Sequence, residues 1–127
     1  MNATTPVPGL DGRRPIDITT TGRRTGEPRR IEIVYHVIDG RLFISGSPRP
    51  GRTRAWIHNL ESDPHLTFHL KGAVRADLPA TARVITDPDE RRRVLSWITT
   101  NAWKNQDLET MMEASPLIEV TIEDEGA

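Results

Sequence analysis

Short stretches of alternating apolar and polar residues recur along the chain and predict β-strands. The first begins at Ile16, and the others cover residues 29–38, 42–45, 65–71, 74–86 and 117–122. Asp39-Gly40 predicts a tight hairpin turn, so the first three strands are expected to form an antiparallel meander. Pro79 is typical of an edge strand or a bulge, because proline donates no backbone hydrogen bond.

Three stretches between the strands predict helices, from about residue 53 to 62, from residue 88 to about 99, and over roughly residues 106–113. Asp87 is expected to be the N-cap of the second helix and Pro88 its first residue, with the Glu90 side chain reaching back in a capping box. Hairpin strands with helices between the later ones predict an α+β fold that is mainly β. We expect a small antiparallel barrel with helices at its ends.

Length and composition limit what the chain can be. Its 127 residues suit one domain, expected over residues 16–124, and residues 1–15 predict an irregular N-terminal arm because they are rich in proline and glycine. The absence of cysteine excludes disulfides, a thiolate nucleophile and cysteine-based metal sites. No stretch has the roughly 18 consecutive apolar residues of a transmembrane segment, and residues 1–12 lack the pattern of a signal peptide, so we expect a cytoplasmic protein.

Charge is distributed unevenly, although the formal net charge is only −1. Residues 1–60 contain ten arginines and five acidic residues, whereas residues 61–127 contain seven basic and thirteen acidic residues. A surface that binds nucleic acid usually has a net basic balance with interleaved aromatic residues, and this chain has only six aromatic residues. We therefore expect no nucleic-acid partner.

The sequence TTTGRRTGEPRR at residues 19–30 follows the first predicted strand and places four arginines around two glycines. Gly22 and Gly26 can adopt a positive φ, which would let backbone N–H groups converge on one point. Each guanidinium group can bind two oxygens of a phosphate or carboxylate, with about 1.5 to 3 kcal/mol for each charge-assisted hydrogen bond. The turn predicts a site for a phosphorylated or polycarboxylated small molecule. The alternative is a solvated basic hairpin turn.

The four histidines, His36, His58, His65 and His69, do not form a metal-ligand pattern. His65 and His69 lie on the same side of a predicted strand, but about 13 Å apart, too far to share an ion held at about 2 Å. We expect no metal site. His58, on the first predicted helix, is a candidate proton donor to a substrate.

Residues 19–29 resemble the TTGR(K/R)(S/T)GxPR signature of the deazaflavin-dependent nitroreductases, a family of split-barrel proteins similar to flavin reductases. Similar features follow in the same order at residues 39–40, 44–47, 56–60, 63–64, 77–83 and 87–91, so that the resemblance covers about residues 16–95. It implies a split β-barrel like that of FMN-binding pyridoxamine phosphate oxidases. It also implies binding of coenzyme F420, a deazaflavin with an anionic tail, and hydride transfer to a small-molecule electron acceptor such as a quinone, a nitroaromatic or an enone.

The same resemblance implies which residues contact the cofactor. Four residues of the turn would hold the phosphate and glutamate tail: Arg23, Arg24, Thr25 and Arg29. The ring and linker would lie against Ser45, Gly46, Ser47, Ala55, Trp56 and Asn59, with Tyr35 on the strand behind. Because reduced deazaflavin itself provides the hydride, the protein need only bind it, orient it and exclude water, and no catalytic residue is expected.

Two features differ from the mycobacterial members of that family. Pro48 stands where they usually have a lysine, and their C-terminal segment supplies tyrosines to the substrate pocket, whereas Tyr35 is the only tyrosine here. The large apolar residues of this segment are expected either to form a pocket wall instead or to belong to the core; they are Trp97, Trp103, Met111 and Met112.

Two other functions remain open. An FMN-binding split-barrel oxidoreductase would need a phosphate clamp but fewer positive charges than this turn carries. A non-catalytic protein that stores, delivers or senses the deazaflavin would bind it without turnover. Split barrels often pair through their sheets, so a homodimer is the expected assembly.

Overall fold

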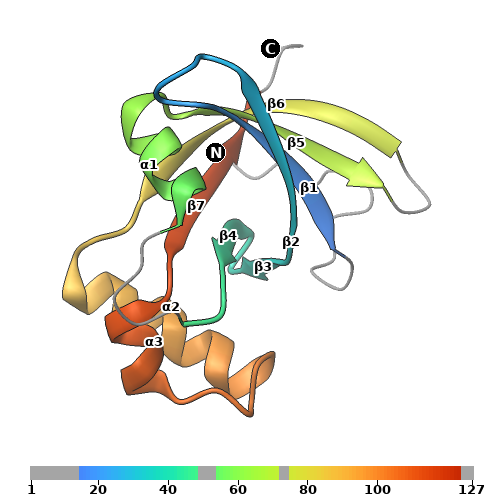
Figure 1. Ribbon diagram of the computed structural model, residues 1–127. Coiled ribbons are helices and arrows are strands. Elements are labelled where there is room, and N and C mark those ends of the chain that lie inside the picture. The colour runs from blue at the N-terminus through green and yellow to red at the C-terminus, as the bar shows by residue number, and fades with distance from the viewer. Residues whose placement is uncertain (1–14, 49–53, 72–74, 124–127) are drawn as a thin grey trace.

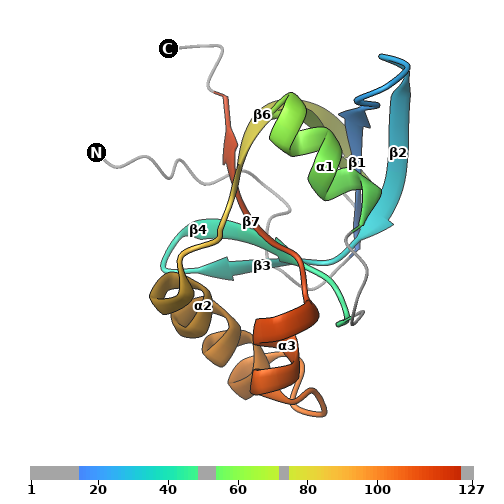
Figure 2. The same ribbon diagram turned by 60° about the vertical axis from the view of Figure 1, so that its left-hand side comes forward.

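The computed structural model describes residues 15–48, 54–71 and 75–123, which form a curled antiparallel sheet and three helices (Figures 1 and 2). The strands are β1 Ile16–Thr21, β2 Pro28–Ile33, β3 Tyr35–Ile38, β4 Arg41–Ser45, β5 His65–Lys71, β6 Arg75–Val84 and β7 Leu117–Ile122. The helices are α1 Ala55–Ser62, α2 Pro88–Asn101 and α3 Leu108–Ala114. The prediction of a small antiparallel barrel with helices is confirmed. The predicted arm lies, apart from Pro15, outside the described residues.

The strands follow the order β2-β1-β5-β6-β7-β4-β3, and all neighbours are antiparallel. The prediction of one strand over residues 29–38 is wrong, because β2 ends at Ile33 and β3 begins at Tyr35. β2 pairs with β1, whereas β3 pairs with β4, so the two halves lie at opposite edges of the sheet. Alternation continues across Val34 while the neighbouring strand changes, and the sheet therefore curls into a half-barrel.

The turn between β3 and β4 confirms the predicted hairpin. Asp39 and Gly40 both have positive φ, 52° and 76°, as expected for an Asp-Gly turn of this kind. Pro79 lies inside β6, but the pairing of β6 with β7 begins at the next residue, where Ala80 pairs with Ile122. Pro79 thus lies just outside that ladder of paired residues, where its carbonyl still accepts a hydrogen bond from the Glu123 N–H at 2.9 Å, and its missing N–H is tolerated at this end of the ladder.

The helices begin largely as predicted. The Asp87 side chain accepts a hydrogen bond from the Glu90 backbone N–H at 2.9 Å, so Asp87 is the N-cap of α2. The predicted return contact of a capping box is wrong: the two Glu90 carboxylate oxygens instead accept hydrogen bonds from the Arg83 guanidinium at 2.9 and 2.6 Å. The Asp107 side chain caps α3 through the Thr110 N–H in the same way.

Two apolar clusters hold these elements together. The larger one lies inside the curled sheet, where α1 contributes Trp56, Ile57 and Leu60. The second joins β4 and β7 to α2 and α3, which lie together as a separate layer near β3 and β4 (Figure 2). Met111 is fully buried in this second cluster, so this methionine belongs to the core.

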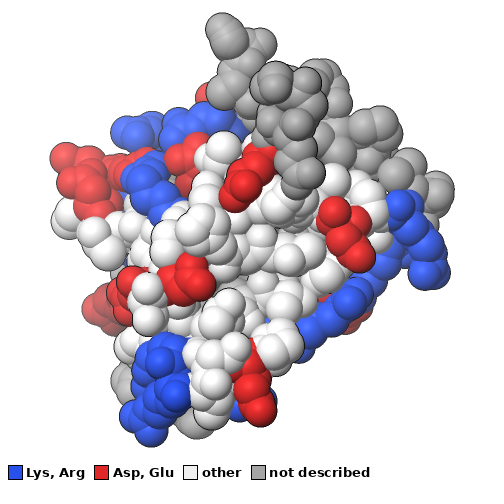
Figure 3. Space-filling model, turned by 90° about the horizontal axis from the view of Figure 1, so that it is seen from above, with Lys and Arg blue, Asp and Glu red and all other residues white. Residues whose placement is uncertain are grey.

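The outer surface carries charges of both signs. In the view from above, basic and acidic side chains are interspersed around an uncharged area, and no large basic patch covers this face (Figure 3). The uneven charge along the sequence therefore does not produce a basic face in this view. None of the helices in the described ranges is long and apolar enough to cross a membrane.

Candidate cofactor site

The arginine turn, residues 22–27, joins β1 to β2 and is closed by backbone hydrogen bonds. The Gly22 N–H donates to the Glu27 carbonyl and the Gly26 N–H to the Gly22 carbonyl, both at 2.8 Å. Gly26 has a positive φ of 73°, as predicted, but Gly22 does not. Gly22 is needed for space instead, because a Cβ there would lie 3.1 Å from Thr25 Oγ1 and 3.2 Å from the Glu27 carbonyl oxygen.

The backbone N–H groups of this turn are mostly used within the protein. The Arg23 N–H donates to Asn59 Oδ1 at 3.1 Å, and the Glu27 N–H donates to Thr25 Oγ1 at 3.2 Å. Together with the N–H groups of Gly22 and Gly26, four donors are therefore satisfied internally. The expectation that backbone N–H groups converge on a ligand is wrong for these four, so the arginine side chains are the main candidates for binding an anion at this turn.

The arginines of this segment divide between two faces. Arg23, Arg24 and Arg29 are exposed. Arg30, the next residue of β2, faces the other way and binds the Asp17 carboxylate at 2.8 Å. Hydrogen bonds from Lys71 and Arg30 hold the pKa of Asp17 below its ordinary value. Arg30 is exposed too but is held by this ion pair, which leaves Arg23, Arg24 and Arg29 as the candidates for binding an anionic ligand.

Asn59 of α1 anchors the turn to the helix. Its Oδ1 accepts the Arg23 N–H, and its Nδ2 donates to the buried Thr20 hydroxyl at 3.1 Å. Asn59 is itself only 6% exposed. The residue expected to contact the cofactor therefore positions the arginine turn against α1.

A cavity of about 640 Å³ lies next to this assembly, between the end of β2, the end of β4 and the start of α1. It brings together five of the predicted cofactor residues: Ser45, Gly46, Ser47, Ala55 and Trp56. Tyr35 is not among the lining residues. It is 1% exposed and packs edge-to-face on Phe68 inside the barrel, with ring centroids 5.6 Å apart.

Arg54 also lines this cavity, and sequence reasoning missed it. Its Nη2 donates to the Ser47 carbonyl at 2.6 Å, which fixes the chain beyond β4 against the start of α1. A Cβ at Gly46 would lie 3.1 Å from the Arg54 guanidinium carbon, so glycine allows this close approach. The Ser45 hydroxyl donates to the Pro116 carbonyl at 2.7 Å and is used for structure. No motif marks Arg54, because its role depends on where the chain beyond β4 runs.

Trp103, from the α2–α3 connection, completes the cavity wall. The ring lies against His36 with centroids 5.2 Å apart and an interplanar angle of 78°. His36 is 4% exposed, and burial lowers its pKa to about 4. Of the four apolar residues considered for a pocket wall, Trp103 thus lines this cavity, whereas Trp97 is 37% exposed.

The other histidines have partners outside this cavity. His65 bonds to Asp63 at 2.9 Å, and His69 bonds to Thr19 and Asp77, both at 2.7 Å. His58, the candidate proton donor, contacts the Glu61 carboxylate at 3.3 Å and does not line the cavity.

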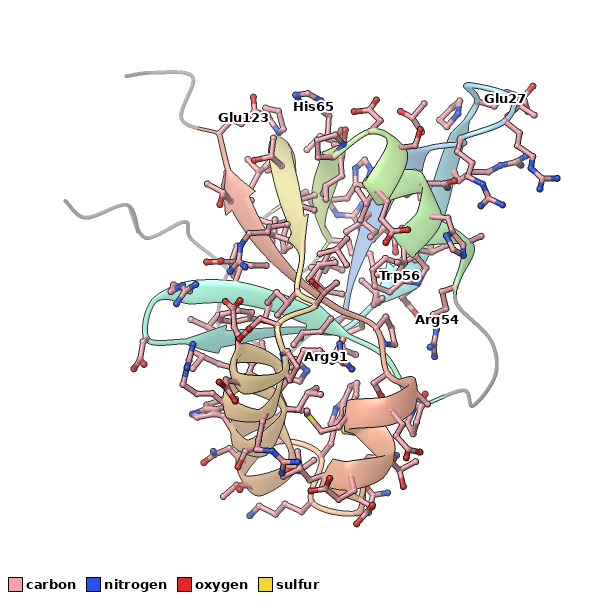
Figure 4. The ribbon with its side chains drawn as sticks, turned by 90° about the vertical axis from the view of Figure 1, so that its left-hand side faces the viewer. Glu27, Arg54, Trp56, His65, Arg91 and Glu123 are labelled. Atoms are coloured by element: carbon pink, nitrogen blue, oxygen red, sulfur yellow. The ribbon has the colours of Figure 1, made fainter. Side chains whose placement is uncertain are left out.

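Strand β2 links the arginine turn to the cavity. Arg29, Ile31 and Ile33 alternate onto the same face of β2, and the last two contribute to the cavity and its core contacts. Four strand residues span about 13 Å, so an elongated ligand could place a planar ring in the cavity and an anionic tail at the arginines. Glu27 of the turn, Trp56 and Arg54 follow one another down this side of the molecule (Figure 4). The donor set fits a deazaflavin with an anionic tail.

Solved structures of similar fold support the architecture. A conserved hypothetical protein, Rv2991 from Mycobacterium tuberculosis, has a TM-score of 0.70 at 19% identity over 91% of this chain and 77% of its own. An F420-H2-dependent reductase, FDR-A, has a TM-score of 0.59 at 18% identity over 85% of this chain and 94% of its own. A pyridoxine-phosphate-oxidase-family protein from Clostridium acetobutylicum has a TM-score of 0.68 at 13% identity over 90% and 78%. The fold is therefore a split barrel.

A family model assigns the chain more closely than these distant structures can. It matches residues 4–125, nearly the whole sequence, and describes F420H(2)-dependent quinone reductases. The expected resemblance to deazaflavin-dependent enzymes is thereby confirmed, with coenzyme F420 as the cofactor. The protein belongs to the F420H(2)-dependent quinone reductase family.

Proposed function

We propose that this enzyme transfers a hydride from reduced F420 to a quinone, with nitroaromatic and enone compounds as further candidate acceptors. One observation carries the proposal: the cavity of about 640 Å³ is lined by Ile31 and Ile33 of β2, and the exposed Arg29 lies on the same face of that strand, next to the turn with Arg23 and Arg24. A ring site joined to a cationic turn suits a cofactor with a flat reactive end and a charged tail. The family match supports the quinone as the first acceptor to test.

The bound reduced deazaflavin would supply the hydride, and the residues of this chain would bind it, orient it and exclude water. Arg23, Arg24 and Arg29 would hold the anionic tail through charge-assisted hydrogen bonds. Trp56 and Trp103 would enclose the ring and the acceptor between apolar surfaces. Asn59 would act indirectly, by holding the turn that carries the arginines.

The contribution of the arginine turn can be measured by replacing Arg23 and Arg24 together with alanine. We expect F420 to bind about tenfold to a hundredfold more weakly, because each lost exposed charge-assisted bond costs about 1 kcal/mol or more. A deazaflavin without the tail should bind nearly as before. Fluorescence titration of both ligands at two salt concentrations gives the affinities.

A charge-matched control is the double replacement of Arg75 and Arg93 with alanine, since both residues are exposed and neither lines the cavity. This control should leave the affinity for F420 within about twofold at moderate salt, where distant surface charges are screened. An equal loss for the tailless ligand and for F420 would remove the tail-binding role from the turn.

The remaining assignments follow from the same purified protein. Preferential binding of FMN over F420 would favour an FMN-dependent oxidoreductase, and F420 binding without turnover of any quinone, nitroaromatic or enone would favour a carrier or sensor. A homodimer in the cytoplasm remains our expectation for its assembly and location, and sedimentation velocity checks the first.

A further inference from the structure

A second cavity, of about 490 Å³, lies next to the cavity of the candidate cofactor site (the cofactor cavity). Pro116 lines the second cavity and Gly46 the cofactor cavity, and a Cβ at Gly46 would lie 3.3 Å from Pro116. It is bounded by α1, the end of β6, the start of α2 and the connection from α3 to β7. Its volume falls within the range typical of small-molecule sites, about 300 to 1,000 Å³. The cofactor site uses none of these elements except α1 and the neighbouring Arg54.

The wall of this cavity contains a cation that has no carboxylate partner among the described residues. The Arg91 guanidinium donates to four backbone carbonyls, those of Ile85 at 3.4 Å, Met111 at 3.2 Å, and Met112 and Ser115 at 2.9 Å. Burial lowers its pKa, and no nearby carboxylate in the described ranges raises it. The carbonyls of Met111, Met112 and Ser115 lie at the C-terminal end of α3 and offset the charge only in part, so an anion beside it would be stabilised.

A hydroxyl group next to this cation also lacks a partner. Ser115 is 5% exposed, lines the cavity, and its Oγ has no hydrogen-bond partner in the described part of the chain. Its own carbonyl accepts the bond from Arg91, so the two donors lie close together. A buried polar group without a partner costs about 1 to 3 kcal/mol, and a ligand oxygen would remove that cost.

The rest of the cavity is largely apolar, with acidic side chains at its edge. The apolar lining comes from Ile57, Val84, Ile85, Met112, Pro116 and Leu117. Glu61 and Glu113 are exposed, so solvent screens their charges more strongly than that of half-buried Arg91. Arg54 and Arg91 both lie in the region between α1 and the α2–α3 layer (Figure 4). These features fit a ligand with an apolar body and one carboxylate.

We propose that this cavity is a second binding site, for a small apolar monocarboxylate whose oxygens accept hydrogen bonds from Ser115 and lie beside Arg91. The site is separate from the cofactor cavity and does not depend on the identity of the cofactor or the acceptor. Arg54 lines both cavities, which places the second ligand next to the cofactor site.

Benzoate is the probe, and benzamide, its neutral counterpart of similar shape, is the control ligand. Calorimetric titration of the protein without F420 should give saturable binding of benzoate and at least tenfold weaker binding of benzamide. Replacing Ser115 with alanine should weaken benzoate about three- to tenfold, as expected for one hydrogen bond. Absence of saturable benzoate binding, or equal binding of benzamide, overturns the proposal.

Matched substitutions locate the ligand. Ala114→Phe fills the second cavity and should abolish benzoate binding, whereas Ala55→Phe puts the same side chain at the cofactor cavity and should leave it unchanged. Thr86→Trp, at an exposed position of the second cavity, provides another blocking variant should Ala114→Phe fail to fold. Equal loss of benzoate binding in the Ala55→Phe variant would place benzoate in the cofactor cavity and refute the second site. F420 binding is measured in a separate titration, so failure of the proposed function is distinguished from failure of the second site.

Discussion

His36 makes the stability of this protein depend on pH between about 4 and 6.5. Its ring is 4% exposed, lies 5.2 Å from the Trp103 ring, and has an Nε2 atom without a hydrogen-bond partner in the described ranges. Burial lowers the pKa of His36 from 6.5 to about 4. The folded protein therefore keeps this imidazole neutral at pH values where the unfolded chain protonates it.

The sign and size of the effect follow from these two pKa values. Between pH 6.5 and 4 the unfolded state binds more protons than the folded state, so the free energy of unfolding decreases as the pH falls. Above pH 6.5 the contribution is complete. The difference between 6.5 and about 4 corresponds to roughly 3 kcal/mol at most, and its steepest slope approaches about 1.4 kcal/mol per pH unit.

His36→Phe is the matched variant, because it keeps a ring against Trp103 but removes the titrating group. Urea unfolding followed by tryptophan fluorescence should be measured for both proteins from pH 7.5 to pH 4. All other carboxylates and histidines titrate in both proteins, so their effects cancel in the difference. The parent protein should lose up to about 3 kcal/mol relative to the variant across this interval. Parallel curves would refute the assignment of a buried neutral His36.

Two further predictions concern the arginine turn. Asn59→Ala removes the hydrogen bonds to Thr20 and to the Arg23 N–H, and should lower the free energy of unfolding by about 1 to 3 kcal/mol. Urea unfolding measures this difference, and a decrease below about 0.5 kcal/mol would contradict the anchoring role. Gly26→Ala should cost about 1 kcal/mol, because φ is 73° there although no atom lies within 4 Å of an added Cβ. Gly26→Asn should cost less, and equal thermal stability of all three proteins would show that the turn relaxes.

The elements of this fold could be predicted where one local pattern determines one local structure. Residues 65–71 and 117–122 alternate and form strands, and the Asp39-Gly40 pair forms the expected turn. Residues 29–38 alternate equally well but form two strands. The alternation indicates which side chains are buried, but it does not indicate with which neighbouring strand each residue pairs. The exchange of partners at Val34 is a property of the whole sheet.

The residues of the candidate site could likewise be predicted only in part. The glycines and arginines of the turn and the residues at the end of β4 could be identified from their order, and the structure places the latter in one cavity. Asn59 and Tyr35 remain predicted cofactor contacts, and the structure adds that Asn59 holds the turn and that Tyr35 packs on Phe68. A polar side chain bonded inside the protein and one facing a ligand have the same sequence signal. Arg54 was missed because only the folded chain brings it to Ser47.

The cofactor cavity lies where strand pairing does not close the barrel. β2 and β4 do not pair, and the chain crosses between their two regions of the sheet in the single residue Val34. The cavity is lined by residues 31–34 on one side and 45–47 on the other, the places where a continuous sheet would have closed the space with backbone hydrogen bonds. α1 covers the space through Ala55 and Trp56 but leaves room for a planar ring. The same strand β2 that leaves the sheet open also carries Arg29 at its other end, so the break in pairing both creates the candidate ring site and places it on the strand that leads to the cationic turn.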